Sequence, residues 1–148
     1  MDLYEKILGM SRCFNGFSRE DLKQLLAISS KDFWQTGEDI FLEGDNGRDM
    51  YIILSGKIDI WRKTADAQLS LATLSMGESF GEMALIIGGR RGASAKAIED
   101  TLALHVSHER LTEAPGPAAI LYRNIARELA DRLNCANDVI VFQSLIKE

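Results

Sequence analysis

Histidine, cysteine and proline are scarce in this sequence of 148 residues, which contains two of each. Cys13 and Cys135 stand too far apart for a metal-binding or redox motif, so we expect two free thiols, each buried or half-buried. His105 and His108 come at the end of an expected strand, where we expect them on the surface. Because a metal enzyme needs more histidines with carboxylates, and no nucleophile stands beside a base, the sequence predicts neither a metal site nor an enzyme.

A long apolar segment and an excess of basic residues are also missing. No apolar run approaches the length of a bilayer-spanning helix, and the opening MDLYEKILGM lacks the apolar core of a secretory signal. We therefore expect a cytoplasmic protein that makes no contact with membranes. The net charge of -5 argues against broad electrostatic binding to nucleic acid, but it is compatible with a small local site for an anion.

The remaining composition predicts one domain that covers 1–148. The hydrophobic fraction of 46% is enough for a core. Helical patterns cover about 2–29, where Ser18 followed by Asp21 resembles a capping box at a helix start. The apolar face of that helix carries Leu22, Leu25, Leu26 and Ile28.

Short segments rich in β-branched and aromatic residues, separated by glycine turns, fill the region from about 30 to 107. The run KIDIW alternates as a half-buried strand does. This pattern predicts a mainly β fold with flanking helices: an eight-stranded jelly-roll β sandwich with N-terminal helices and a long C-terminal helix. The candidate strands are 31–35, 39–42, 50–55, 57–63, 68–74, 79–80, 94–98 and 101–106.

The region from about 108 to 146 returns to a helical pattern. The run PGP at 115–117 marks a break, and Pro117 is well placed at a helix start. The helix would have about 28 residues and a length of roughly 40 Å. Because a small β domain cannot cover such a helix, we expect part of its apolar stripe to meet the same helix of a second copy. The stripe consists of Ile125, Leu129, Leu133, Ala136 and Ile140.

The segment FGEMALIIGGRRGASAKA, residues 80–97, combines an acid, two arginines and four glycines. A short helix that starts near Glu82 would direct free backbone N–H groups toward an anion, and Gly81 would leave that backbone accessible. Arg91 can grip a phosphate, whereas Glu82 can accept hydrogen bonds from sugar hydroxyls. The residues themselves leave a second interpretation open, in which Glu82 and Arg91 form a surface ion pair around a loop.

This segment resembles the phosphate-binding cassette of the cyclic nucleotide-binding domain family. The family pattern is F-G-E-[LIVM]-A-L, a short turn, and then R-[AST]-A, and this sequence has FGEMAL, IIGGR and RGA. The segment GEDIFLEGDNGRDMYIILSGKIDI, residues 37–60, also resembles the first half of the family's domain. The resemblance covers about 10–143.

The resemblance implies specific roles for residues of the cassette. Glu82 would bind the ribose 2′-hydroxyl and Arg91 the cyclic phosphate, while Arg90 would be a solvated surface residue. Further contacts to the ribose or the phosphate would come from the backbone N–H groups of Met83, Ala84 and Ala93. Four further residues would either line the pocket on the side of the base or be ordinary residues of the β core: Ile60, Leu71, Ala72 and Phe80.

Two departures from the family pattern affect the expected ligand. Gly92 replaces the usual Ala, Ser or Thr, so a hydroxyl contact to the phosphate is missing. Ala136 and Asn137 stand where proteins that resemble the catabolite activator carry a Thr-Ser pair that contacts the base. Asn137 retains donors and acceptors for a base edge, although the interpretation as a solvated helix asparagine is slightly favoured.

Three functions follow from the resemblance. The first is a cAMP or cGMP sensor that signals through its C-terminal helix and dimerises through it. The second is a degenerate family member that acts as a dimerisation or interaction module without a nucleotide. The third is the sensor part of a transcription factor like the catabolite activator. As the chain ends at Glu148, with no room for a helix-turn-helix domain, we expect no direct DNA binding by this chain.

Overall fold

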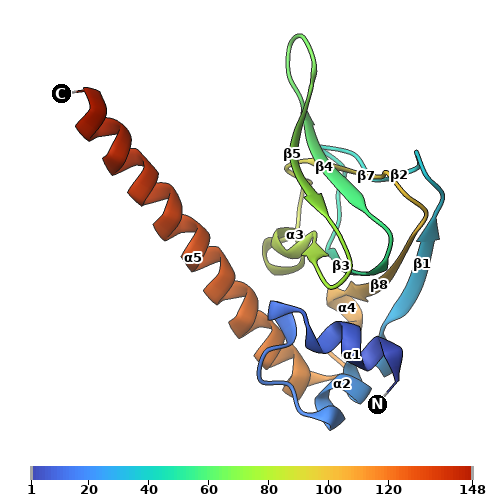
Figure 1. Ribbon diagram of the computed structural model, residues 1–148. Helices are drawn as coiled ribbons and strands as arrows, with labels where there is room; N and C mark the ends of the chain where they lie inside the picture. Colours follow the sequence, from blue (N-terminus) through green and yellow to red (C-terminus); the bar gives the residue numbers. More distant parts are fainter. Residues whose placement is uncertain (1, 148) are drawn as a thin grey trace.

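Two four-stranded antiparallel sheets form the body of the molecule (Figure 1). The structure, a computed structural model, describes residues 2–147. In one sheet the strand order is β1(Ser30–Trp34), β8(Thr101–Ser107), β3(Asp49–Ser55) and β6(Ser79–Phe80). In the other it is β2(Asp39–Phe41), β7(Ser94–Ala97), β4(Ile58–Lys63) and β5(Gln68–Leu74). The predicted eight-stranded sandwich is confirmed, and each predicted strand overlaps an observed one.

An aromatic-rich core fills the space between the two sheets. Its buried members include Ile53, Ile58 and Ala103, with Tyr51 and Phe80 contributing the rings. Strand β3 is buried along almost its whole length because it lies inside its sheet and is covered on both faces. By contrast, every residue of β5 except the last is exposed, and the β4–β5 hairpin extends beyond the sandwich.

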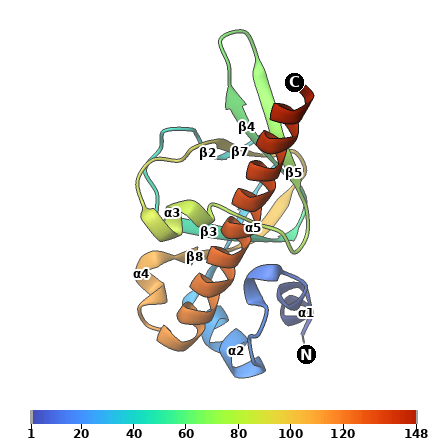
Figure 2. The same ribbon diagram turned by 90° about the vertical axis from the view of Figure 1, so that its left-hand side faces the viewer.

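The N-terminal helices pack on the outer face of the β3–β8 sheet and form a second core there. They are α1(Leu3–Gly9), the 3-10 helix η1(Arg12–Phe14) and α2(Arg19–Ile28). The predicted capping box is present, since Ser18 Oγ accepts from the N–H of Asp21 and the Asp21 carboxylate accepts from the N–H of Ser18. Figure 2 shows these helices stacked below the sandwich beside the start of the last helix. Their core includes Leu8, Phe14, Leu25, Leu104 and Leu121.

Two helices complete the chain, α4(His108–Leu111) and α5(Pro115–Lys147). The long helix has 33 residues and begins at Pro115, so the prediction that it starts at Pro117 was wrong by two residues. The first turn of a helix makes no intrahelical use of its N–H groups, and the whole PGP run therefore fits inside that turn. None of the described helices is both long enough and apolar enough to cross a bilayer.

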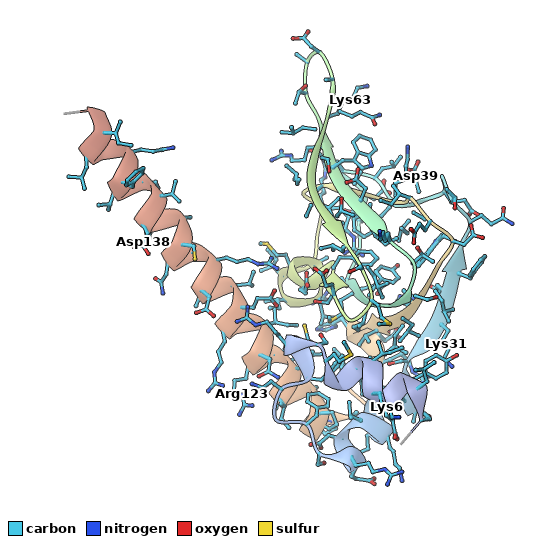
Figure 3. All side chains as sticks on the ribbon, in the orientation of Figure 1. Lys6, Lys31, Asp39, Lys63, Arg123 and Asp138 are labelled. Atoms are coloured by element: carbon cyan, nitrogen blue, oxygen red, sulfur yellow. The ribbon has the colours of Figure 1, made fainter. Side chains whose placement is uncertain are left out.

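The two halves of α5 differ in their surroundings. Leu121 and Ile125 are buried against the N-terminal helices, whereas every residue of 130–146 is exposed. In Figure 3 the side chain of Asp138 and those around it lie well away from the sandwich. Cys13 is buried as expected, but Cys135 belongs to the uncovered half and is exposed, which corrects the expectation of a covered thiol.

Candidate functional site

Arg91 lies in the loop between α3(Glu82–Ile87) and β7, and 7% of its surface is exposed. Its Nη1 atom donates to the carbonyl oxygen of Asp49 at 2.9 Å and, less closely, to that of Gly81 at 3.4 Å. The guanidinium also lies over the ring of Phe41, 4.2 Å from the ring centre. A Cβ at Gly47 would be 2.8 Å from Arg91 Nε, so the guanidinium in its present position requires a residue without a side chain there or a shift of its own.

The charge of Arg91 has no carboxylate partner within 4.0 Å among residues 2–147. Burial lowers the pKa of the guanidinium, and the nearby Tyr51, Asp49 and Asp45 act in the opposite direction. An arginine nevertheless stays protonated in proteins. The fold therefore holds a buried cation whose hydrogen-bond acceptors are neutral carbonyls, and such a cation is poorly compensated without an anion.

An aromatic and charged wall stands beside Arg91. The Tyr51 ring stacks on Phe80 at 5.0 Å and on His105 at 4.9 Å between ring centres. Burial raises the pKa of Tyr51 to about 12. His105 is half-buried, with Nδ1 3.1 Å from an Asp32 oxygen and Nε2 2.9 Å from an Asp49 oxygen. The expectation of a plain surface histidine was therefore wrong for His105, because two strands beside β8 supply these carboxylates.

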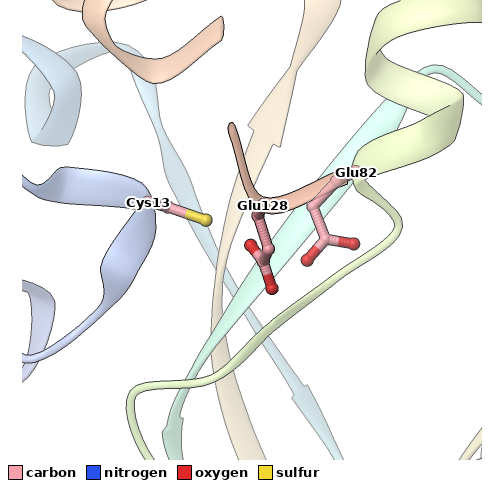
Figure 4. Close-up of side chains that lie close together, drawn as sticks. All are labelled: Cys13, Glu82 and Glu128. Atoms are coloured by element: carbon pink, nitrogen blue, oxygen red, sulfur yellow. The ribbon is translucent and has the colours of Figure 1, made fainter. Parts of the chain in front are cut away.

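Glu82 occupies the first position of α3 and is 8% exposed. Gly81 precedes it as the N-cap with φ of 83°, a conformation that favours glycine, and no side chain caps the helix. Ser79 Oγ donates to the Glu82 carboxylate at 2.5 Å. The carboxylate lies close to the Cys13 thiol and to Glu128 of α5 (Figure 4).

The cassette residues predicted from the sequence are brought together around Gly81. Its carbonyl accepts from Arg91, and its backbone continues directly into Glu82. Glu82 and Arg91 are both buried and form no ion pair with each other, which rules out the surface-pair interpretation. Of the other cassette residues, Ala84 is buried and Ala93 half-buried, while Met83, Gly92 and the neighbouring Arg90 are exposed.

The predicted base wall is less compact than the cassette. Ile60 of β4 is half-buried and pairs in register with Ala72 of β5, which is exposed. Leu71 is 50% exposed, whereas Phe80 is a core residue stacked on Tyr51. Asn137 is exposed on α5, beyond the part of the helix that packs on the domain.

Sequence reasoning missed four residues that surround Arg91. Asp49 contributes a backbone carbonyl, so its side chain carried no signal for this contact. Phe41 and Tyr51 resembled ordinary strand residues, and their role depends on how the two sheets face each other. Gly47 belongs to the segment 37–60 that resembles the family's domain, but its close approach to Arg91 is visible only in three dimensions.

Comparisons with known proteins identify the family of the chain and match its fold. The family model for the cyclic nucleotide-binding domain matches residues 31–114. The cyclic AMP receptor protein of Thermus thermophilus is 34% identical over 137 residues, which make up 90% of this chain and 63% of that protein. The chain thus spans less than two thirds of the length of this relative.

Two solved structures show the same fold at similar levels of identity. The catabolite activator protein of Thermus thermophilus superposes with a TM-score of 0.83 at 33% identity, covering 90% of this chain and 63% of that chain. The N-terminal domain of a transcriptional regulator from Streptomyces coelicolor superposes with a TM-score of 0.77 at 29% identity, covering 90% and 94%. The resemblance inferred from the cassette is confirmed, and the chain belongs to the cyclic nucleotide-binding domain family.

Proposed function

We propose that this chain is a cytoplasmic cyclic nucleotide sensor that binds cAMP or cGMP at the Arg91–Glu82 cassette. One observation carries the proposal: the buried Arg91 cation has only neutral carbonyl acceptors among residues 2–147. A cyclic phosphate supplies the missing negative charge and accepts bidentate hydrogen bonds from the guanidinium. The name of the Thermus relative, a cyclic AMP receptor protein, supports this choice of ligand.

The remaining cassette groups complement a nucleotide in this proposal. Glu82 accepts from the ribose 2′-hydroxyl, and N–H groups of Met83, Ala84 and Ala93 donate to the ribose or phosphate. The N-terminus of α3, which no side chain caps, suits a negatively charged group. With Gly92 and Ala136 in place of residues that offer hydroxyls, we expect weak discrimination between cAMP and cGMP.

Replacing Arg91 tests the site directly. Arg91→Glu should abolish cAMP and cGMP binding in isothermal titration calorimetry, because the phosphate would face a like charge. The matched control is Arg90→Glu, since Arg90 precedes it in the chain and is exposed. Arg91→Gln places no charge in the buried position and repeats the test should the first variant not fold. Unchanged binding in a folded Arg91 variant would refute the assignment.

Signalling in this proposal runs through α5 and a homodimer. The second half of the helix exposes Leu133, Ile140 and further apolar side chains, which a second copy of the helix would cover. Nucleotide binding would shift the balance between two positions of α5 by favouring one of them. Because one similar structure is the N-terminal domain of a transcriptional regulator, we extend the proposal to a role as the sensor part of such a regulator.

A nucleotide-free interaction module is the second candidate, and the exposed half of α5 together with Gly92 favours it. Melting curves with and without ligand separate the two candidates. A ligand at one hundred times its dissociation constant stabilises the folded state by about 2.7 kcal/mol, and we expect a rise in Tm of about 5 to 10 °C. If neither nucleotide raises the Tm, the interaction module is the better description.

A further inference from the structure

One thiol and two carboxylates, side-chain types that can bind metals, converge where three elements of the fold meet. Cys13 comes from η1, Glu82 from α3 and Glu128 from α5, and their ligand atoms all lie within 4.8 Å of one another (Figure 4). Cys13 is 2% exposed and Glu82 8% exposed, while the Glu128 side chain is 20% exposed. The sequence separations among the three residues made this cluster invisible to motif searches.

Glu82 is poorly compensated in these surroundings. Its carboxylate accepts one hydrogen bond within residues 2–147, from Ser79, and forms no ion pair there, although more than nine-tenths of the residue is buried. A second carboxylate, that of Glu128, lies within the same 4.8 Å. Arg132, one turn further along α5, pairs with Glu128 at 2.7 Å and is 60% exposed, and this pair leaves Glu82 without a cation of its own within residues 2–147. Among the described residues, the buried Glu82 carboxylate therefore has a second carboxylate nearby and no cation paired with it, which is unfavourable for its charged form.

We propose that Cys13, Glu82 and Glu128 form a binding site for a divalent cation of the Zn²⁺ type, with a water molecule as the fourth ligand. A thiolate with two carboxylates suits Zn²⁺ or Cd²⁺ and not Mg²⁺ or Ca²⁺, which prefer oxygen ligands alone. Tetrahedral bonds of usual length place such ligand atoms about 3.4 to 3.6 Å apart. The cluster needs only a contraction of the order of 1 Å to reach this geometry, given its upper limit of 4.8 Å.

Ser79 and a neighbouring cleft support the site. The Ser79 hydroxyl lies 3.2 Å from Cys13 Sγ and donates to Glu82, so it orients two of the three ligands. A cleft of about 330 Å³ between η1 and α5 includes Glu128 in its lining, so solvent reaches this one of the three ligands. Coordination requires the thiolate, so one proton leaves Cys13 Sγ for solvent as the metal–sulfur bond forms.

The site has a regulatory consequence that rests on the proposed nucleotide function. Glu82 would serve either the cation or a ribose, and bound metal would tie α5 to η1 and α3 through Glu128. Metal binding would therefore oppose nucleotide binding and hold the signalling helix in the position seen here. The metal site itself requires no contribution from Arg91, which separates the two proposals experimentally.

Cd²⁺ is the probe, because its thiolate complexes absorb in the ultraviolet, and the two cysteines give a matched pair of variants. Cys135→Ser retains the buried thiol, and we expect its absorbance to saturate at one equivalent of Cd²⁺ per chain. Cys13→Ser retains only the exposed thiol, and we expect no saturable signal at that concentration. The reverse result, or equal signals from both variants, would refute the site.

Charge variants in the Cys135→Ser background test the carboxylates. Glu128→Gln should weaken Cd²⁺ binding at least tenfold, whereas Asp131→Asn, an exposed acid lining the same cleft, should change it less than twofold. Equal effects of the two changes would show general electrostatic attraction and overturn coordination by Glu128. The Arg91→Gln variant should keep the Cd²⁺ signal whether or not the chain binds nucleotide. Loss of the Cd²⁺ signal in this variant would contradict the proposed metal site.

Discussion

The two halves of α5 have the same apolar periodicity but differ in how much of their apolar face is buried. In 115–129 the stripe is covered by η1, α2 and the sheet beneath them, and Leu121 and Ile125 are almost completely buried. In 130–146 the stripe continues through Leu133 and Ile140, which are each 62% exposed. The comparison teaches that periodicity specifies which face of a helix is apolar, whereas the length of the neighbouring elements decides how much of that face is covered.

The largest expected difference between the halves concerns matched leucines. Leu121→Ala should reduce the free energy of unfolding by about 2 to 5 kcal/mol, because it opens a cavity in the helical core. Leu133→Ala should change it by less than about 0.5 kcal/mol, because that side chain is largely in solvent. Urea denaturation at a protein concentration where sedimentation shows monomers provides the measurement. Similar losses for both variants would mean that the second half is covered within one chain.

Two asparagines give a second matched pair. The Asn124 side chain is buried and donates to the carbonyl oxygens of Cys13 and Asn15, both at 2.8 Å. Asn124→Ala should cost about 1 to 3 kcal/mol because it leaves these carbonyls without their donor. Asn137→Ala, on the exposed half, should stay within about 0.5 kcal/mol. Thermal unfolding monitored by circular dichroism measures both changes in stability. An Asn124→Ala variant as stable as the wild type would contradict the expected difference between the two halves.

The exposed half should matter for association instead of folding. The double variant Leu133→Gln with Ile140→Gln should weaken self-association at least tenfold, or about 1.4 kcal/mol, because it places polar groups in the expected helix seam. Val141→Gln is the control, since Val141 is 58% exposed but lies off the stripe. Sedimentation equilibrium measures the effect. A wild-type chain that remains monomeric at every concentration would remove the dimer from the proposal.

The smallest effect is expected where the two halves meet. Arg12 of η1 pairs with Asp131 at 3.2 Å, and the two side chains are 72% and 63% exposed. Arg12→Ala should lower stability by less than about 1 kcal/mol, and the loss should shrink in high salt because solvent and ions screen the pair. Denaturation of both proteins at low and high salt checks this. A large, salt-independent loss would show that the first half ends later than we describe.

Much of the fold was predictable from short segments. Eight strands separated by glycine turns, the Ser18 capping box and the long last helix all depend on residues close in sequence. The start of α5 was missed by two residues because the prolines fit anywhere in its first turn. Cys135 was misjudged because its exposure depends on where the covered part of α5 ends.

In the candidate site too, the residues close in sequence were predictable and the contacts between distant segments were not. Glu82, Arg91 and the glycines around them were recognisable because the cassette is one continuous segment. The carbonyl of Asp49, the ring of Phe41 and the close approach of Gly47 were not, since they come from other strands. The proximity of Cys13 and Glu128 to Glu82 was equally hidden, as the three residues belong to three separate helices.

The sequence by itself determined the family, the order of the elements and the residues that carry the cassette, because each of these is encoded in local pattern and spacing. Only the tertiary structure decided that Arg91 is a buried cation held by carbonyls and that Glu82 faces Cys13 and Glu128. It also decided that half of α5 stays uncovered. Burial and charge compensation arise between distant segments, and local pattern contains no record of which segments will meet.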